Sequence, residues 1–152
     1  ADGTQGKDDQ VLLDVNVLVA LAWPNHAHHH AARKWFTDHR HSGWATTPIT
    51  EAGFVRVSSN KAAIPTATTP SVAIALLTRL TSGGDHAFWP DDVRGVTGET
   101  TDPARLSSYR DVTDAHLVAV ASRHGGSLVT FDARIERLVP TTDAPLLQVL
   151  SV

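Results

Sequence analysis

The chain has 152 residues, which is the length of one domain, and its 41% apolar and 19% charged residues are ordinary proportions for a globular protein. It contains no cysteine, which excludes disulfides, thiolate zinc sites and cysteine nucleophiles. The net charge is −3. There is no apolar run of eighteen residues and no secretory signal pattern, so we expect no membrane span. The absence of cysteine agrees with a reducing compartment, and we expect a cytoplasmic protein.

The start of the chain differs from the rest. Residues 1–10 are polar and without a pattern, and we expect them to be a disordered leader or a remnant of expression. Residues 11–152 contain no linker or repeat and predict a single domain. Without this leader and the four acids discussed below, the remainder carries a charge of +3, and ten of the thirteen basic residues of the whole chain are arginine. A mildly basic face of this kind suits phosphates.

Strands and helices are predicted to alternate in the first half. Residues 11–14 form an apolar run that ends in an acid, which is typical of a buried parallel strand. Residues 17–23 are apolar on all sides and predict a buried helix that ends at Pro24, and an amphipathic helix is expected over 27–40. A strand over 43–46 follows, and Thr-Pro pairs at 47–48 and 69–70 predict the starts of two further helices.

The second half continues the alternation. The predicted elements are a strand over 86–89, a long loop over 90–102, a helix over 111–124, a strand over 127–130, a short helix over 134–139 and a strand over 146–150. Strands that alternate with helices predict an α/β fold, in which helices cover both faces of a mostly parallel sheet.

Four acids are expected to converge at one edge of this sheet. Asp14 and Asp132 stand where predicted strands end, and Glu51 and Asp114 lie in the first turns of helices. In open parallel sheets, ligands bind beyond the carboxyl ends of the strands. Carboxylates that lie close together cannot all stay ionised without a cation, and hard Mg²⁺ or Mn²⁺ ions prefer oxygen ligands. Such a site suits phosphoryl chemistry.

Three of these acids also have simpler interpretations. Asp114 can complement a helix dipole, Glu51 can be a solvated acid of a first turn, and Asp132 can cap the next helix. Asp14 closes an apolar strand and precedes an apolar helix, where an unpaired acid would be costly to bury. Asp111 is interpreted as the N-cap of its helix.

The histidines and the loop sequences do not indicate a zinc site, a nucleotide-binding loop or a serine nucleophile. His26 and His30 are four residues apart and would share a helix face, but the segment lacks the glutamate of zinc-protease helices and is interpreted as a solvated surface. His116 and His124 are expected at the surface or the core edge. The turn at 15–17 has no glycine, which argues against a P-loop and a dinucleotide fold, and there is no Gly-x-Ser-x-Gly motif.

Four segments resemble, in order and spacing, the motifs of PIN-domain ribonucleases. They are LLDVNVLVAL at 12–21, Thr50-Glu51, VTDAHLVA at 112–119 and LVTFD at 128–132. The resemblance covers about residues 11 to 150 and is closest to the VapC toxins of VapBC toxin–antitoxin pairs, especially the branch with Asp-Val-Asn after the first strand.

This resemblance implies a three-layer α/β/α sandwich around a mostly parallel sheet of about five strands. It implies an endoribonuclease that depends on one or two Mg²⁺ or Mn²⁺ ions and cleaves structured RNA, such as tRNA or a ribosomal RNA loop. It also implies a homodimer and a cognate VapB-type antitoxin that blocks the site. By position, the metal-binding and catalytic acids are Asp14, Glu51, Asp114 and Asp132.

The chain departs from many relatives at one position, where Asn16 replaces a serine or threonine. Asparagine can still hydrogen-bond a carboxylate or a metal-bound water, and Thr130 is expected to support the site in the same way. The expected reaction is in-line attack by a metal-bound water, which leaves a 5′ phosphate and a 3′ hydroxyl.

Recognition of RNA is expected to come from arginines and exposed aromatic side chains. Arg110, Arg134 and Arg137 flank the acids and are candidate contacts to phosphates, with ordinary surface charge as the alternative. Trp89 and Tyr109 are candidates for stacking on an unpaired base, with a position in the core as the alternative.

Three other functions make different demands on the same residues. A phosphatase of the haloacid-dehalogenase kind needs a second acid where this chain has Asn16, and a late lysine, whereas the lysines are Lys7, Lys34 and Lys61. A PIN nuclease of RNA processing would act without an antitoxin. A non-catalytic PIN-like binding module would have lost the acids, and all four are present.

Overall fold

The computed structural model describes residues 10–141 and 145–152, so the expected leader lies outside the described residues except for Gln10. Five strands form one sheet, in which each neighbouring pair runs parallel, in the order β3-β2-β1-β4-β5. The strands are β1 (Val11–Leu13), β2 (Trp44–Thr46), β3 (His86–Phe88), β4 (Ser127–Thr130) and β5 (Leu147–Val149). The predicted α/β class and number of strands are confirmed.

Alternating side chains of the central strands serve two cores. Leu13 and Val129 pack on one face of the sheet, and Leu12 and Leu128 pack on the other, all without exposed surface. This follows from the period of two in a strand, and from the burial of both faces when helices cover a parallel sheet. The chain therefore forms the three layers that the sequence resemblance implied.

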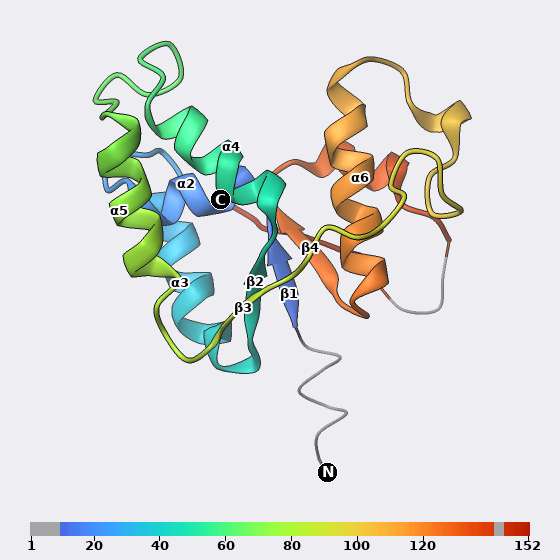
Figure 1. Ribbon diagram of the computed structural model, residues 1–152, viewed down its shortest axis with the longest axis horizontal. Coiled ribbons are helices and arrows are strands. Elements are labelled where there is room, and N and C mark those ends of the chain that lie inside the picture. The colour runs from blue at the N-terminus through green and yellow to red at the C-terminus, as the bar shows by residue number, and fades with distance from the viewer. Residues whose placement is uncertain (1–9, 142–144) are drawn as a thin grey trace.

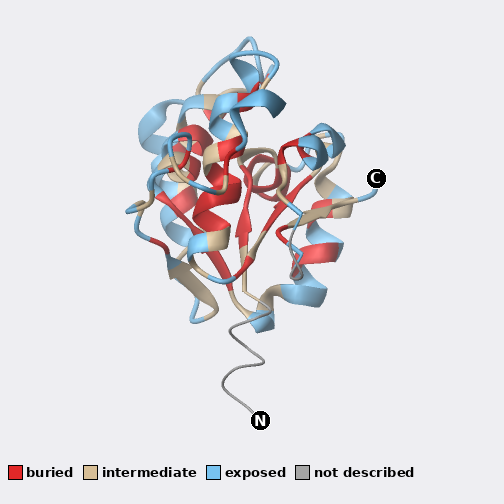
Figure 2. Ribbon diagram, turned by 90° about the vertical axis from the view of Figure 1, so that its right-hand side faces the viewer, coloured by how far each residue is buried: buried red, intermediate tan, exposed pale blue. Residues whose placement is uncertain are grey.

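The helices divide between the two faces (Figure 1). The first face carries α2 (Val15–Ala22), α3 (His29–His39), α4 (Pro48–Ser58) and α5 (Pro70–Leu80), and the second carries α6 (Arg110–Arg123) and the 3-10 helix η3 (Ala133–Leu138). Buried residues follow the strands and the inner sides of the helices, whereas the outer sides are exposed (Figure 2). Two short 3-10 helices, η1 (Arg40–Ser42) and η2 (Pro103–Arg105), lie in connections. Among the described residues, no helix is long and apolar enough to cross a membrane.

The starts of three helices differ from the prediction. α2 begins two residues early, because the Asp14 carboxylate accepts the Val15 N–H at 2.8 Å and caps the helix. α3 begins only at His29, so His26 lies before the helix and shares no helix face with His30. α6 begins at Arg110, so the interpretation of Asp111 as its N-cap was wrong.

Helices α2 and α4, which both begin at the carboxyl edge of the sheet, approach each other closely at Gly53. A Cβ atom on Gly53 would lie 2.6 Å from Cγ2 of Val15, closer than real contacts allow. Only glycine permits this approach, because Val15 is β-branched and cannot turn its methyl away freely. Gly53 therefore sets the distance between the residue that follows Asp14 and the helix that carries Glu51.

Candidate active site

The first acid, Asp14, is buried at the carboxyl end of the central strand. Its Oδ1 accepts the Val15 N–H and its Oδ2 accepts the Thr130 hydroxyl, both at 2.8 Å. Burial raises the pKa of this carboxyl, and the two hydrogen bonds oppose the rise. The strand order places β1 between β2 and β4, so Asp14 stands at the middle of the sheet edge.

Thr130, at the end of β4, connects the residues on either side of it. Its hydroxyl donates to Asp14 and accepts the Asn16 Nδ2–H and the Asp132 N–H, each at 3.1 Å. Asn16 also accepts the Phe131 N–H through Oδ1 at 3.3 Å. With both acceptor positions of the hydroxyl filled, its proton is directed at Asp14. Thr130 therefore contacts the Asp14 carboxylate directly, and Asn16 contacts it only through Thr130.

Asp132 follows β4 and caps η3. Its Oδ1 accepts the Arg134 backbone N–H at 3.0 Å, and the Arg134 guanidinium binds both carboxylate oxygens. This pairing holds the pKa of Asp132 below its usual range. The simpler interpretation of Asp132 as a helix cap is confirmed, and it coexists with a position beside the other acids.

Asp114 is the fifth residue of α6, so it lies one turn later than predicted, and Asp111 is the acid of the first turn. Burial, followed by the negative charges of Asp14, Asp132 and Asp111, raises the pKa of the Asp114 carboxyl to about 7. Within the described part of the chain, no hydrogen bond to its carboxylate is found. It lines a concave site of about 160 Å³ that also contains Asp132 and Arg134. A half-buried carboxylate among like charges is what a divalent cation would stabilise.

Glu51 belongs to a neighbouring network on the β2–β3 side of the edge. The buried Thr46 hydroxyl donates to Glu51 Oε2 at 2.7 Å, and Nε2 of His86 lies 2.8 Å from the same hydroxyl oxygen. Because the hydroxyl proton is given to Glu51, the imidazole must be the donor to Thr46. Burial lowers the pKa of His86, and the charge of Glu51 opposes this. Sequence reasoning missed His86, since only the pairing of β2 with β3 brings it here.

The three aspartates thus lie within electrostatic reach of one another, and Glu51 does not join them. In residues 10–141 and 145–152, no three His, Asp or Glu side chains stand close enough to bind one metal ion as they are. The donor set nevertheless fits Mg²⁺ or Mn²⁺ in its chemistry, because it consists of carboxylate oxygens and one of them lacks any compensating donor.

Residues 11–139 match the family model of the PIN domain. The chain belongs to the PIN-domain family. It is 55% identical over 139 residues to Ribonuclease VapC39 of Mycobacterium tuberculosis, a match that covers 91% of this chain and 98% of that protein. It is 49% identical over 142 residues to Ribonuclease VapC38 of the same organism, covering 91% and 99% of the two chains. Ribonuclease VapC44 is 44% identical over 126 residues, covering 83% and 88%. The predicted resemblance to VapC toxins is confirmed.

Asp111 and Arg137 form a second acid–arginine pair in this PIN domain, and this pair joins two elements of the fold. Asp111 is only 4% exposed, and its carboxylate accepts Arg137 Nη2–H at 2.6 Å, Arg137 Nη1–H at 3.0 Å and the Ser107 N–H at 2.7 Å. These donors hold the pKa of Asp111 well below its usual range. Arg137 also donates to the Arg105 carbonyl at 3.1 Å. It ties η3 to the start of α6. Because Arg137 also lines the hollow that contains Asp114 and Asp132, its contact with RNA stays a prediction.

The two candidate stacking residues separate clearly. Trp89 is 5% exposed, packs in the core and stacks on the His124 ring with centroids 4.6 Å apart, so its expected alternative, a core position, holds. Tyr109 is 81% exposed, beside the site, and its hydroxyl accepts the Arg110 Nε–H at 3.4 Å. Of these two candidates, Tyr109 is the one whose ring is open to a base.

Several histidines outside the acidic site make local contacts in the PIN domain. His26 Nδ1 accepts the His28 N–H at 3.0 Å, and His29 Nδ1 lies 2.8 Å from the Ala20 carbonyl. His116 Nε2 lies 2.9 Å from Asp91 Oδ1, which fastens the loop over 90–102 to α6. These partners agree with positions at the surface and the core edge.

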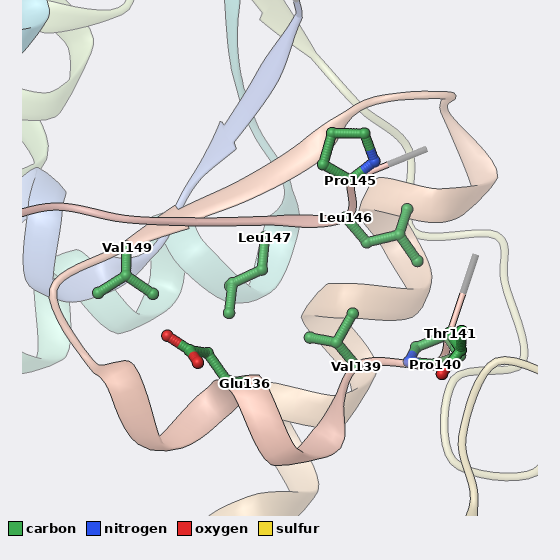
Figure 3. Close-up of a pocket in the computed structure, with 8 residues that line it drawn as sticks. All are labelled: Glu136, Val139, Pro140, Thr141, Pro145, Leu146, Leu147 and Val149. Atoms are coloured by element: carbon green, nitrogen blue, oxygen red, sulfur yellow. The ribbon is translucent and has the colours of Figure 1, made fainter. Parts of the chain in front are cut away.

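A larger cavity of about 520 Å³ lies away from the acids, between η3 and the edge strand β5 (Figure 3). It is lined mostly by apolar side chains, including Val139, Leu147 and Val149, with Glu136 as its charged residue. Asp114 and Asp132 therefore line the smaller hollow at the carboxyl edge of the sheet, and none of the candidate catalytic acids lines this larger cavity.

Proposed function

We propose that this PIN domain is a Mg²⁺- or Mn²⁺-dependent endoribonuclease toxin of the VapC type. The observation that carries the proposal is the half-buried Asp114 carboxylate, which lacks a hydrogen bond and stands beside Asp14 and Asp132 at the carboxyl edge of the sheet. The relatives named Ribonuclease VapC support the same activity, because they match almost the whole length of this chain.

The residues of the chain would divide the work as follows. Asp14, Asp114 and Asp132 would hold one or two ions, and Glu51 would join them after its carboxylate leaves Thr46. When bound, such an ion supplies an activated water and neutralises charge on the phosphate. Thr130 and Asn16 keep the Asp14 carboxylate oriented through the hydrogen bonds described above. The expected products carry a 5′ phosphate and a 3′ hydroxyl.

Contacts to the substrate would come from the rim of the site. Arg110 and Arg134 line the same hollow as Asp114 and Asp132, so their guanidinium groups can meet phosphates that approach the acids. The exposed ring of Tyr109 adds a surface on which an unpaired base can stack. We infer that the substrate is structured RNA, such as tRNA or ribosomal RNA, encountered in the cytoplasm.

The proposed partners are a VapB-type antitoxin, which would block the acids, and a second copy of the chain in a homodimer. They are inferred from the relatives with the VapC name. The competing phosphatase chemistry needs a second acid two residues after Asp14, where this chain has Asn16, whose amide is bonded to Thr130 and Phe131.

Cleavage of total tRNA and ribosomal RNA in Mg²⁺ or Mn²⁺, followed by mapping of new 5′ ends, tests the proposal. We expect discrete cuts with 5′ phosphates that vanish with EDTA and in Asp14→Asn. Asp92→Asn is the matched control, because this exposed acid pairs with Arg123 away from the acids and should cut normally. Cuts that survive EDTA and Asp14→Asn, or ends with a 2′,3′-cyclic phosphate, would contradict the metal-dependent mechanism.

A further inference from the structure

One of the three clustered aspartates already binds a cation from the chain itself. Arg134 Nε–H donates to Asp132 Oδ1 at 3.0 Å, and Arg134 Nη2–H donates to Asp132 Oδ2 at 2.9 Å. This is the bidentate geometry in which a planar guanidinium matches a carboxylate best. The backbone N–H of Arg134 adds a third donor to Oδ1 at 3.0 Å. Three of about four acceptor positions on this carboxylate are therefore filled.

The other two aspartates lack such a partner. Both oxygens of Asp14 accept neutral donors, from Val15 and Thr130, and Asp114 has no hydrogen bond to its carboxylate in the described part of the chain. Asp132 is therefore the acid whose binding of a divalent ion must disturb an existing ion pair. A guanidinium and a divalent ion on the same carboxylate repel each other, because arginine stays charged.

The ion pair is placed so that it can open. The Arg134 side chain is 73% exposed, whereas that of Asp132 is 24% exposed. An exposed guanidinium loses little when it leaves a carboxylate, because water replaces its hydrogen bonds. Since Arg134 lies only two residues after Asp132 and lines the same hollow as Asp114, a released side chain stays at the rim of the site.

Arg137, by contrast, is held in place by its contacts. Arg137 binds the nearly buried Asp111 and the Arg105 carbonyl together, so it is held from two sides. Arg110 lines the same hollow but contacts the Tyr109 hydroxyl rather than an acid. Of these three arginines, Arg134 alone pairs with an acid of the proposed metal site while its side chain is mostly exposed.

We propose that Arg134 is a positioning residue that exchanges partners during metal loading. In the free protein its guanidinium orients Asp132 and competes with the divalent ion. Once the ion binds, the guanidinium is displaced from Asp132 and contacts a phosphate of the RNA. This inference rests on the proposed nuclease function and goes beyond it, since it couples occupancy of the metal site to recognition of the substrate.

Titration of the free protein with Mn²⁺, without RNA, tests the competition by calorimetry. We expect Arg134→Gln to bind Mn²⁺ about 3- to 10-fold more tightly than wild type, because a like charge beside the ion is removed. Arg110→Gln removes the same charge from the same rim without touching Asp132, and its affinity should change less than about twofold. Unchanged or weaker binding in Arg134→Gln, or equal tightening in Arg110→Gln, would overturn the competition.

Two further readouts follow the exchange itself. The ¹⁵Nε–H signal of Arg134 should shift on titration with Mg²⁺, while that of Arg137 stays in place, and a fixed Arg134 signal would overturn the release. At saturating Mn²⁺, Arg134→Gln should raise KM for RNA about fivefold or more with kcat changed less than about twofold, because a phosphate contact is lost. An unchanged KM would overturn the phosphate contact.

The same titration separates this inference from the proposed function. If wild type binds Mn²⁺, Asp14→Asn does not, and Arg134→Gln binds as wild type, the metal site stands and the role of Arg134 falls. If wild type does not bind Mn²⁺, or binds it as well as Asp14→Asn does, the metal site and this inference fall together.

Discussion

The ends of β4 and β2 both carry a buried threonine that donates a hydrogen bond to a carboxylate, but the groups around the two threonines differ. Thr130 ends β4 and donates to Asp14, and Thr46 ends β2 and donates to Glu51, and both threonines are fully buried. The hydroxyl of Thr130 receives amide donors, whereas that of Thr46 receives the His86 imidazole. A buried threonine thus aims a carboxylate in both places, and the surrounding groups decide whether that carboxylate joins other acids or stands beside an imidazole.

The largest expected difference between the two networks is in catalysis. Asp114→Asn should lower RNA cleavage at least about 1000-fold, because several kcal/mol of charge stabilisation by a bound ion would be lost. Glu51→Gln, on the other network, should cost only about 10- to 100-fold. Single-turnover cleavage in Mn²⁺ measures both. Equal losses would mean that the two networks act as one site.

The same Asp114→Asn change should stabilise the metal-free protein by about 1 kcal/mol, since it removes a half-buried charge beside two other acids and solvent screens part of the gain. Urea unfolding with EDTA measures the free energy of unfolding. Asp38→Asn, which alters an exposed pair with Lys34, is the control and should be neutral within about 0.5 kcal/mol. No stabilisation would contradict the mutual repulsion of the acids.

The next difference concerns the two threonines. Thr130→Val should weaken Mn²⁺ binding about 10- to 100-fold and destabilise the protein by about 1–3 kcal/mol, because Asp14 loses its orienting donor and buried groups lose a partner. Thr46→Val removes the same hydroxyl from the Glu51 network and should change Mn²⁺ affinity less than about threefold. Calorimetry and urea unfolding compare the pair, and a reversed order of the affinities would break the comparison.

Gly53 links the two networks through the contact of α4 with α2. Gly53→Ala should destabilise the protein by about 1–3 kcal/mol, because the new methyl overlaps Val15 and the side chain of Val15 is stiff. Thermal unfolding measures the loss. Gly84→Ala is the control, since a Cβ atom there meets nothing within 4 Å. If both variants have the same unfolding temperature, the close approach of the two helices does not contribute to stability.

The smallest effect is expected outside both networks, in the loop over 90–102. His116→Ala should speed proteolytic cutting within this loop and lower stability by about 1 kcal/mol, because the contact with Asp91 is lost. Cleavage of RNA should stay within about twofold of wild type. A large loss of cleavage would show that His116 takes part in the reaction.

Most of the fold could be predicted from local pattern. Apolar runs bounded by Thr-Pro and glycine signals placed all five strands and the major helices, because burial of one face imposes a period along the chain. The starts of α4 and α5 are those predicted from the Thr-Pro pairs, whereas the starts of α2, α3 and α6 differ from the prediction. Asp14 caps α2 earlier than its apolar pattern suggests. α6 begins at Arg110, and the Asp111 carboxylate accepts hydrogen bonds from Ser107 and Arg137.

The sequence by itself predicted the parallel sheet from periodicity, and it predicted the family and the candidate acids from four motifs that resemble those of PIN domains. Tertiary structure alone decided how these acids are surrounded. Only the packing of distant elements brings Arg137 to Asp111, His124 over Trp89, and His86 to the hydroxyl that orients Glu51. Side-chain partners of this kind carry no periodic signal, because each is set by the register of strands and the docking of helices that lie far apart in the chain.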